Sequence, residues 1–331
     1  MTRLECSTLR CIAIISIVLH NFTHWLPGGS LENEFSFNFD YYMHFWNNVI
    51  SPDFLIHVFS FWGHLGVPVF VFLTGYGLAR KYDDKADLGW KSFLYRHWVK
   101  LFVPMLCGTL VYFIVLFALE GHLDCSASNV FLQCIMALNF ISPADIEPMP
   151  YWYLGMTLQL YVIYLLFVYK RSTTILLLLA IASFIFIALN IRYLGFLRNN
   201  SVGWLVPFFM GVAYSRYQEV VHFERGSRLI VATCLSLLII LVCGFELYAW
   251  LLTPLFVVIF AVGIVKYVPV TIQQKMESIG RYSLYFMIVH PITRVLSMQS
   301  LSDFGGYLCL LLYILTTFLV VYSFIYIKSK L

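Results

Sequence analysis

Apolar runs of about 20 residues recur along the whole chain, and they constrain its fold more than any other feature. Hydrophobic residues make up 61% of the 331 positions and charged residues only 11%, whereas a soluble domain has about 25% charged residues. This composition is typical of a polytopic membrane protein. We therefore expect an all-α transmembrane helix bundle that forms one integral membrane domain over residues 1–331, without a cleavable signal peptide.

About ten spans fit the pattern of apolar runs. The sixth is short, and Pro291 interrupts the ninth. The expected spans are residues 9–27, 60–80, 101–119, 151–169, 173–191, 203–215, 229–245, 248–266, 283–300 and 306–327.

The charges between these runs predict the orientation of the chain. Residues 28–59 and 120–150 contain acidic side chains but neither lysine nor arginine. Lysine and arginine gather instead in 80–100 and in the other alternate loops. Because cytoplasmic loops retain lysine and arginine, we expect both termini to be cytoplasmic.

The first apolar run carries ionisable side chains: Arg10 near its start, then His20 and His24. A helix rises about 1.5 Å per residue, so Arg10 and His20 lie roughly 15 Å apart along the axis, and His20 shares a face with His24. Ionisable groups at this depth usually line a wet cavity. Histidine exchanges protons near neutral pH, which makes His20 the best general-base candidate. The alternatives are a structural His20, a snorkelling Arg10 and an interfacial His24.

The ninth expected span adds polar groups to such a cavity. His290 precedes Pro291, which we expect to open the helix beside a buried histidine, and Arg294 follows. Because the first and ninth spans both run outward, His20 and His290 can lie at comparable depth. By spacing alone, this pattern also fits a proton-coupled transporter.

Basic residues gather just before the third span. Arg96, His97 and Lys100 share one face of a helix, and such groups bind phosphates, although ordinary cytoplasmic charge is the alternative. Thr74 and Tyr76 could contact a ligand that enters from the same side. The eight cysteines form no C-x-x-C pair, so neither a metal site nor a redox motif is expected.

Aromatic residues are concentrated in two stretches outside the spans. Leu88 to Lys100 alternates bases with aromatics, which predicts an amphipathic interfacial helix. The aromatics of residues 28–59 favour an interfacial belt, with a sugar-binding platform as the alternative.

Five segments, in this order along nearly the whole chain, resemble the membrane acyltransferase 3 family: S-T-L-R-C-I-A-I-I-S-I-V-L-H, V-P-V-F-V-F-L-T-G-Y, Y-R-H-W-V-K-L-F-V-P, Y-W-Y-L-G-M-T-L-Q-L-Y and I-G-R-Y-S-L-Y-F-M-I-V-H-P. Members of this family are ten-helix O-acyltransferases that modify bacterial cell-surface glycans. The resemblance implies an acyl-CoA donor, by family habit acetyl-CoA, on the cytoplasmic side. It implies a hydroxyl of an envelope glycan or lipid-linked saccharide as the acceptor.

The resemblance also assigns expected roles to residues of this chain. His20 corresponds to the catalytic histidine, Arg10 to its partner, and His290 to the family's His-Pro position. The cluster Arg96, His97 and Lys100 resembles the family's R-R-x-x-R motif for the CoA phosphates, with His97 and Lys100 in place of two arginines. Thr74 to Tyr76 occupies the Ser-Gly-aromatic position of the donor site. The expected contacts of the acceptor are Asn21, His24, Trp152 and Arg294.

One departure from the family concerns the first span. The family places histidine eleven residues after the arginine, whereas here the interval from Arg10 to His20 is ten and Asn21 holds the eleventh position. Ten steps of 100° place His20 about 80° from the face of Arg10. Some relatives carry two adjacent histidines here, and His20 then corresponds to one of that pair.

We therefore predict a membrane O-acyltransferase of the bacterial cytoplasmic membrane. Its expected partners are acyl-CoA, a saccharide acceptor and membrane lipids, without nucleic acid or a metal ion. A transporter or flippase for a lipid-linked saccharide is the alternative, and a scaffold that has lost catalysis is a third possibility.

Overall fold

The computed structural model describes residues 1–26, 28–122, 126–141, 151–217, 224–300 and 305–330, and over these residues the chain is helical and contains no strand. The all-α prediction is confirmed, and each of the ten expected spans overlaps a helix. Parts of the expected outer loop 120–150, at 123–125 and 142–150, lie outside the described residues. The α-helices are α1 (Arg3–Thr23), α2 (Phe39–Asn47), α3 (Phe54–Trp62), α4 (Gly66–Tyr82), α5 (Trp90–Glu120), α6 (Ala127–Cys134), α7 (Leu138–Ile141), α8 (Trp152–Ile163), α9 (Thr173–Leu189), α10 (Leu194–Asn199), α11 (Leu205–Tyr217), α12 (Ser227–Cys243), α13 (Leu247–Trp250), α14 (Thr253–Tyr267), α15 (Val270–Arg281), α16 (Ser283–Ser300) and α17 (Gly306–Lys330).

Several of these helices have the length and composition of membrane spans. Within the described residues, four qualify: α1, the continuous segment Phe54–Tyr82, α5 and α17. The bent pair α9–α10 makes a fifth if it is counted as one span, and α8, α12 and α14 are shorter apolar helices. The chain is therefore an apolar helical bundle of the membrane type, and the number of ten spans stays a prediction.

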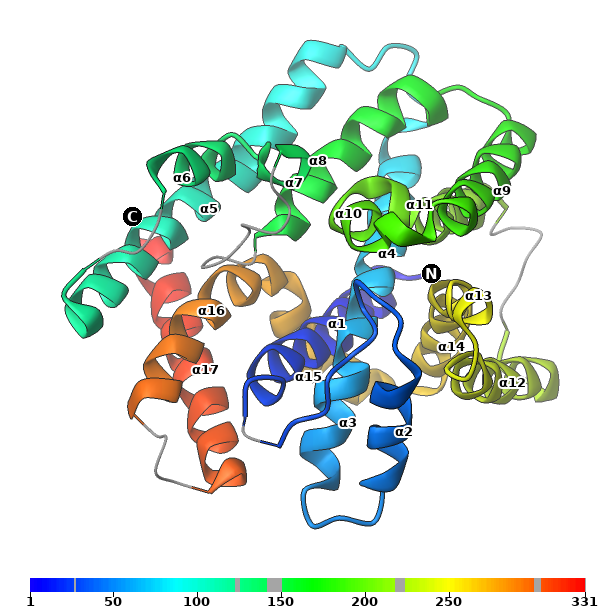
Figure 1. Ribbon diagram of the computed structural model, residues 1–331. Coiled ribbons are helices and arrows are strands. Elements are labelled where there is room, and N and C mark those ends of the chain that lie inside the picture. The colour runs from blue at the N-terminus through cyan, green and yellow to red at the C-terminus, as the bar shows by residue number, and fades with distance from the viewer. Residues whose placement is uncertain (27, 123–125, 142–150, 218–223, 301–304, 331) are drawn as a thin grey trace.

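Helix α1 lies in the middle of the bundle, where it packs against α4, α15 and α16 (Figure 1). Small residues allow its neighbours to come close. A Cβ atom on Gly66 would lie 2.4 Å from the carbonyl oxygen of Ala13, and one on Gly280 would meet the carbonyl of Ser7. The glycines thus bring α4 and α15 into backbone contact with α1, as is usual for helices in membranes.

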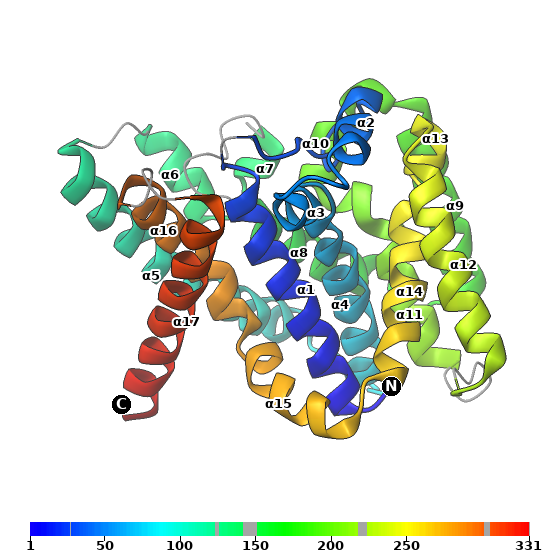
Figure 2. The same cartoon turned by 90° about the horizontal axis from the view of Figure 1, so that it is seen from below.

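The two ends of the bundle differ in what they contain. The N-terminus, the C-terminal end of α17 and α15 lie at one end, while α2, α6 and α10 lie at the other (Figure 2). Both termini therefore lie at the same end of the molecule, as an even number of spans requires.

Two local expectations differ from the structure. The stretch Leu88 to Lys100 is not a separate interfacial helix, because α5 runs without a break from Trp90 to Glu120 and buries Phe93 in its first turn. Helix α16 also continues through Pro291. Proline removes one donor, from the bond to the carbonyl of Met287, and the remaining helical bonds keep the helix together.

The aromatic residues of 28–59 pack mainly on rings outside this stretch, such as those of Phe61, Trp62 and Phe245. Tyr42, Phe45 and Phe61 form a buried cluster between α2 and α3. Phe39 and Trp46 of α2 stay exposed, so only part of the set is available for a belt at the membrane surface.

Candidate active site

A cavity of about 400 Å³ contains most of the ionisable groups that the sequence places inside the bundle. We call it the histidine cavity. It brings together residues from α1, α8 and α16, from the loop after α1, and from the turn before α4. Its lining residues are Ile17, His20, Asn21, His24, Trp25, Glu32, Glu34, Phe35, His64, Val67, Trp152, Tyr153, Asn199, Met287, His290 and Arg294.

His20 is held by the backbone of the segment that packs on α1. Its Nδ1 lies 2.9 Å from the carbonyl oxygen of Ser60, which can only accept a hydrogen bond. Nδ1 therefore carries the proton in the neutral ring, and the lone pair is on Nε2. Gly63 allows this approach, since a Cβ atom there would lie 2.6 Å from the Cβ of His20. The side chain is 6% exposed and lines the cavity.

The loop after α1 brings two carboxyl groups into the histidine cavity. Glu32 lies 3.0 Å from Nδ1 of His24. Burial raises the pKa of the Glu32 carboxyl, but the adjoining His24 and the charges of His20 and His64 together outweigh burial and lower this pKa to about 2. Burial and the neighbouring Glu32 instead raise the pKa of Glu34 well above its usual range. The surroundings therefore favour the ionised form of Glu32 and the neutral form of Glu34.

Two more buried histidines line the cavity. His290 donates from Nδ1 to the carbonyl of Phe286 at 3.1 Å, which leaves its lone pair on Nε2. His64 is 1% exposed. Neither ring nitrogen of His64, nor Nε2 of His290, nor Oε1 of Glu34 has a hydrogen-bond partner among the described residues. Buried polar atoms are normally paired, so these atoms mark a place where a polar ligand would bind.

The other residues predicted for the acceptor also reach this cavity. Asn21 lines it from α1 while its amide bonds the carbonyl of Ile17. Arg294 lies over the ring of Trp25, with its guanidinium carbon 4.8 Å from the ring centre. Trp152 faces Phe35 edge-on, with 5.2 Å between ring centres. Aromatic faces beside amides and carboxyl groups are a suitable lining for a saccharide.

Sequence reasoning missed the roles of Glu32, Glu34 and His64 in this cavity. The two glutamates belong to the acidic stretch 28–59, whose charges predict only the orientation of the chain, and the pattern of the second expected span predicts no role for His64. Their sequence does carry a signal, because His64 lies in an apolar run of membrane length, where an ionisable residue indicates a functional site.

A second cavity, of about 740 Å³, lies toward the end of the bundle that holds the termini. We call it the basic cavity. Arg10, Lys81, Lys100 and Arg281 line it, together with His97 and Thr74. The His97 ring is fixed by a bond from Nδ1 to the carbonyl of Phe93 at 2.7 Å and by the ring of Tyr161, 4.5 Å away between centres. Several cations around one cavity are suited to a polyanionic ligand.

Two residues predicted for the donor site do not line the basic cavity. Arg96 is exposed, and its Nε donates to the carbonyl of Ser92 at 3.1 Å. Tyr76 points to the other side of α4, where its hydroxyl donates to the carbonyl of Met1 at 3.1 Å. Lys81 and Arg281, which sequence reasoning did not select, occupy the cavity instead.

Two aromatic rings lie between the cavities. Phe70 lines the basic cavity and Tyr153 lines the histidine cavity, with 6.0 Å between their ring centres. The Tyr153 hydroxyl contacts the Thr74 hydroxyl, which faces the basic cavity. Side chains alone therefore separate the two cavities at this point.

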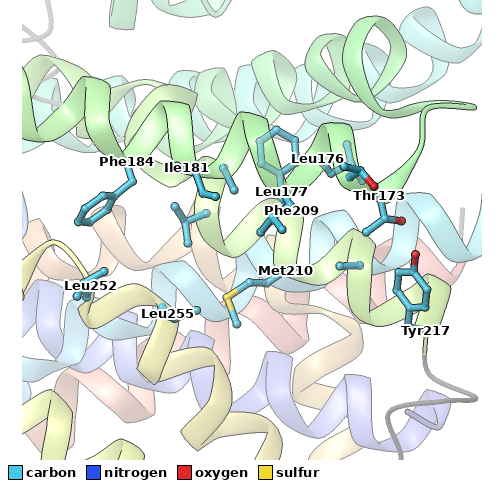
Figure 3. A pocket seen from close by; sticks show the side chains of 14 residues that line it. Thr173, Leu176, Leu177, Ile181, Phe184, Phe209, Met210, Tyr217, Leu252 and Leu255 are labelled. Carbon is cyan, nitrogen blue, oxygen red and sulfur yellow. The ribbon is translucent and has the colours of Figure 1, made fainter.

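A third cavity, of about 600 Å³, lies between α9, α11 and the start of α14 (Figure 3). Leu177, Ile181, Phe184 and Met210 are among its lining residues, and the hydroxyl groups of Thr173 and Tyr217 lie at one end. It contains none of the ionisable groups above. We assign it no chemistry.

Comparison with known proteins supports the family resemblance. The model of the acyltransferase 3 family, described as an acyltransferase domain, matches residues 6–327. No curated protein and no solved structure matches the chain. Since the family model spans nearly the whole length, the chain belongs to the acyltransferase 3 family.

Proposed function

We propose that this membrane acyltransferase is an O-acetyltransferase. It moves an acetyl group from acetyl-CoA to a hydroxyl of an envelope or exported saccharide. We place the donor in the basic cavity, which faces the cytoplasm, and the acceptor in the histidine cavity. The protein then acts in the cytoplasmic membrane of a bacterium with both termini in the cytoplasm.

The observation that carries this proposal is the juxtaposition of the two cavities. Arg10, Lys81 and Lys100 would neutralise the phosphates of CoA. His20 lies in the neighbouring cavity, which has the unpaired polar atoms and aromatic faces expected around a sugar. The acyl end of the donor would pass between Phe70 and Tyr153 to reach His20. A transporter would have no need of a second, strongly basic cavity on one side only.

The tautomer of His20 fits the role of general base. Nε2 accepts the proton of the acceptor hydroxyl while the hydroxyl oxygen attacks the thioester carbonyl carbon. The carbon–sulfur bond then breaks, and the leaving CoA sulfur takes the proton from Nε2. In a two-step variant, Nε2 attacks the thioester first and the acetyl group passes from His20 to the sugar. Both routes depend on the same lone pair.

The test is acetyl transfer by purified His20→Ala protein in nanodiscs, with His122→Ala as the matched control. His122 is exposed and lies outside both cavities. We expect His20→Ala to lose about 10²- to 10⁴-fold in kcat and to keep its affinity for CoA. His122→Ala should behave as the wild type. A folded His20→Ala protein with full acetyl transfer would overturn the mechanism, and an unreactive wild type would favour the transporter.

A further inference from the structure

The loop that follows α1 folds back into the bundle instead of spreading over its surface. The carbonyl oxygen of Asn33 accepts a hydrogen bond of 2.9 Å from Nε1 of the buried Trp250. The carbonyl oxygen of Glu34 accepts one of 3.0 Å from Nη1 of Arg198, which is 3% exposed. Two side chains from distant helices thus fix the backbone on the C-terminal side of Glu32.

The N-terminal side of this loop is fixed as well. Ser30 is fully buried, its hydroxyl lies 2.9 Å from Nδ1 of His57, and its carbonyl accepts a hydrogen bond from the Ser60 hydroxyl. The same residue, Ser60, provides the carbonyl that holds Nδ1 of His20. Ser60 therefore holds both the loop and the imidazole of His20.

This arrangement presents the Glu32 carboxylate to His20 of α1 and to His24, which caps the end of α1. Glu32 lies 3.0 Å from Nδ1 of His24, and the rings of His24 and His20 are 5.5 Å apart between centres. Side-chain polar atoms of His20, Glu32 and Glu34 lie within 4.8 Å of one another. At such distances in a poorly solvated cavity, the charge of one group acts directly on the protonation of another.

We propose that Glu32 is a positioning residue for the reaction, whose carboxylate holds His24 and stabilises the imidazolium that forms when His20 takes up a proton. The inference rests on the proposed function of His20 as the base. Under this proposal, a carboxylate of the loop after α1 takes part in acyl transfer together with the histidines.

The other charged or titratable groups around His20 do not supply this negative charge. They come from the loop after α1, the turn before α4, α10 and α16, and they are Glu34, His64, Arg198, His290 and Arg294. The arginines are cationic and the histidines neutral or cationic. Burial raises the pKa of Glu34, which favours its neutral form, whereas the contact with His24 favours the ionised form of Glu32. Glu32 is therefore the anion that faces His20.

The first test measures acetyl transfer against pH for Glu32→Gln, which keeps the shape of the side chain and removes its charge. We expect kcat to fall about 10²-fold while KM for acetyl-CoA is unchanged. The acid limb of the pH–kcat profile should move about one unit toward lower pH, because an imidazole without a facing carboxylate holds a proton less tightly. Glu32→Asp should restore the position of the acid limb.

The matched control is Asp40→Asn, which removes an exposed carboxylate of α2 outside the cavity. It should leave the rate and the profile as in the wild type. A Glu32→Gln protein with the wild-type profile would overturn the inference, and so would an Asp40→Asn protein that shifts it equally.

A second readout does not depend on acyl transfer. The rate at which diethyl pyrocarbonate modifies His20, followed by peptide mass spectrometry, rises with pH as the imidazole loses its proton. The midpoint of this rise should be lower in Glu32→Gln than in the wild type. If the wild type transfers no acetyl group but the midpoint shifts, the proposed function fails alone. If transfer occurs and the midpoint does not shift, the positioning role of Glu32 fails alone.

Discussion

Glu32 and Glu34 lie two residues apart on one loop, and their surroundings act on their carboxyl groups in opposite directions. His24 holds Glu32 ionised at 3.0 Å, while Oε1 of Glu34 has no hydrogen-bond partner among the described residues. Burial of a carboxyl group favours its protonated form. The pKa values of the pair are therefore shifted apart, which is the usual sign that neighbouring acids have different roles.

The raised pKa of Glu34 makes stability depend on pH. This carboxyl stabilises the fold fully below its unfolded pKa of about 4.5, and that contribution is lost as the pH rises, because the unfolded chain then releases the proton freely. We expect Glu34→Gln, which stays neutral, to raise the apparent Tm by about 2 to 4 °C at pH 7.5 and to leave it unchanged at pH 4. Differential scanning fluorimetry in detergent measures both values.

We expect Glu32→Gln to change the apparent Tm in the opposite direction from Glu34→Gln. The pKa of Glu32 is lowered to about 2, so its contribution to stability is present above about pH 4.5 and is lost as the pH falls toward 2. Its removal should lower the apparent Tm at pH 7.5. A Glu34→Gln protein that is less stable than the wild type at pH 7.5 would show that the Glu34 carboxyl is ionised in the fold.

Among the elements, α1 gives a physical reason for the ten-residue interval between Arg10 and His20. Arg10 lines the basic cavity and His20 the histidine cavity, at different levels of one helix. In the proposed function the two side chains would serve different ends of the donor, so they do not need to share a face of the helix. A rotation of about 80° between them is therefore compatible with both positions.

Helix α5 allows a test of the donor site with a matched pair of lysines. Lys100 lines the basic cavity, whereas Lys91, two and a half turns earlier, does not line it and lies over the ring of Trp90. We expect Lys100→Gln to raise the Kd for CoA about tenfold, the equivalent of one charge-assisted contact, and Lys91→Gln to leave it unchanged. Isothermal titration calorimetry measures both.

Calorimetric titration with CoA also tests whether Arg96 belongs to the donor site. Its side chain bonds the backbone of its own helix, so Arg96→Gln should weaken CoA binding much less than Lys100→Gln does. An effect of Arg96→Gln equal to that of Lys100→Gln would mean that the donor extends beyond the basic cavity.

On the scale of the whole molecule, sequence could predict the helical class, the position of each long helix and the cluster of His20, His24 and His290. These follow from local patterns: apolar length, charge between runs and ionisable residues within them. The entry of Glu32 and Glu34 into the cavity could not be predicted. It depends on anchors far along the chain, such as Arg198 and Trp250, which no local pattern connects to the loop.

Tertiary packing also changed the outcome of two local sequence patterns. The bases before the third span share a helix face, but the neighbouring rings of Tyr82 and Tyr161 select His97 for the cavity, and Arg96 turns outward. Pro291 predicts an opened helix, yet α16 continues through it. A motif thus locates a site to within a turn of helix, and tertiary contacts decide which of its residues reach the ligand.

The molecule has a chemical polarity from end to end, which predicts the side from which each substrate enters. The basic cavity is lined by residues at the start of α16 and the end of α15. Helix α15 and both termini lie at one end of the bundle, and the loop between α1 and α2, which carries Glu32 and Glu34, lies at the opposite end (Figure 2). Because lysine and arginine are retained on the cytoplasmic side, acetyl-CoA should be used only from that side. We expect inside-out membrane vesicles to hydrolyse or transfer the thioester and sealed right-side-out vesicles to do so only after permeabilisation. A thiol-release assay measures the difference. Activity in sealed right-side-out vesicles and none in sealed inside-out vesicles would place the basic cavity on the outer face and reverse the proposed direction of transfer.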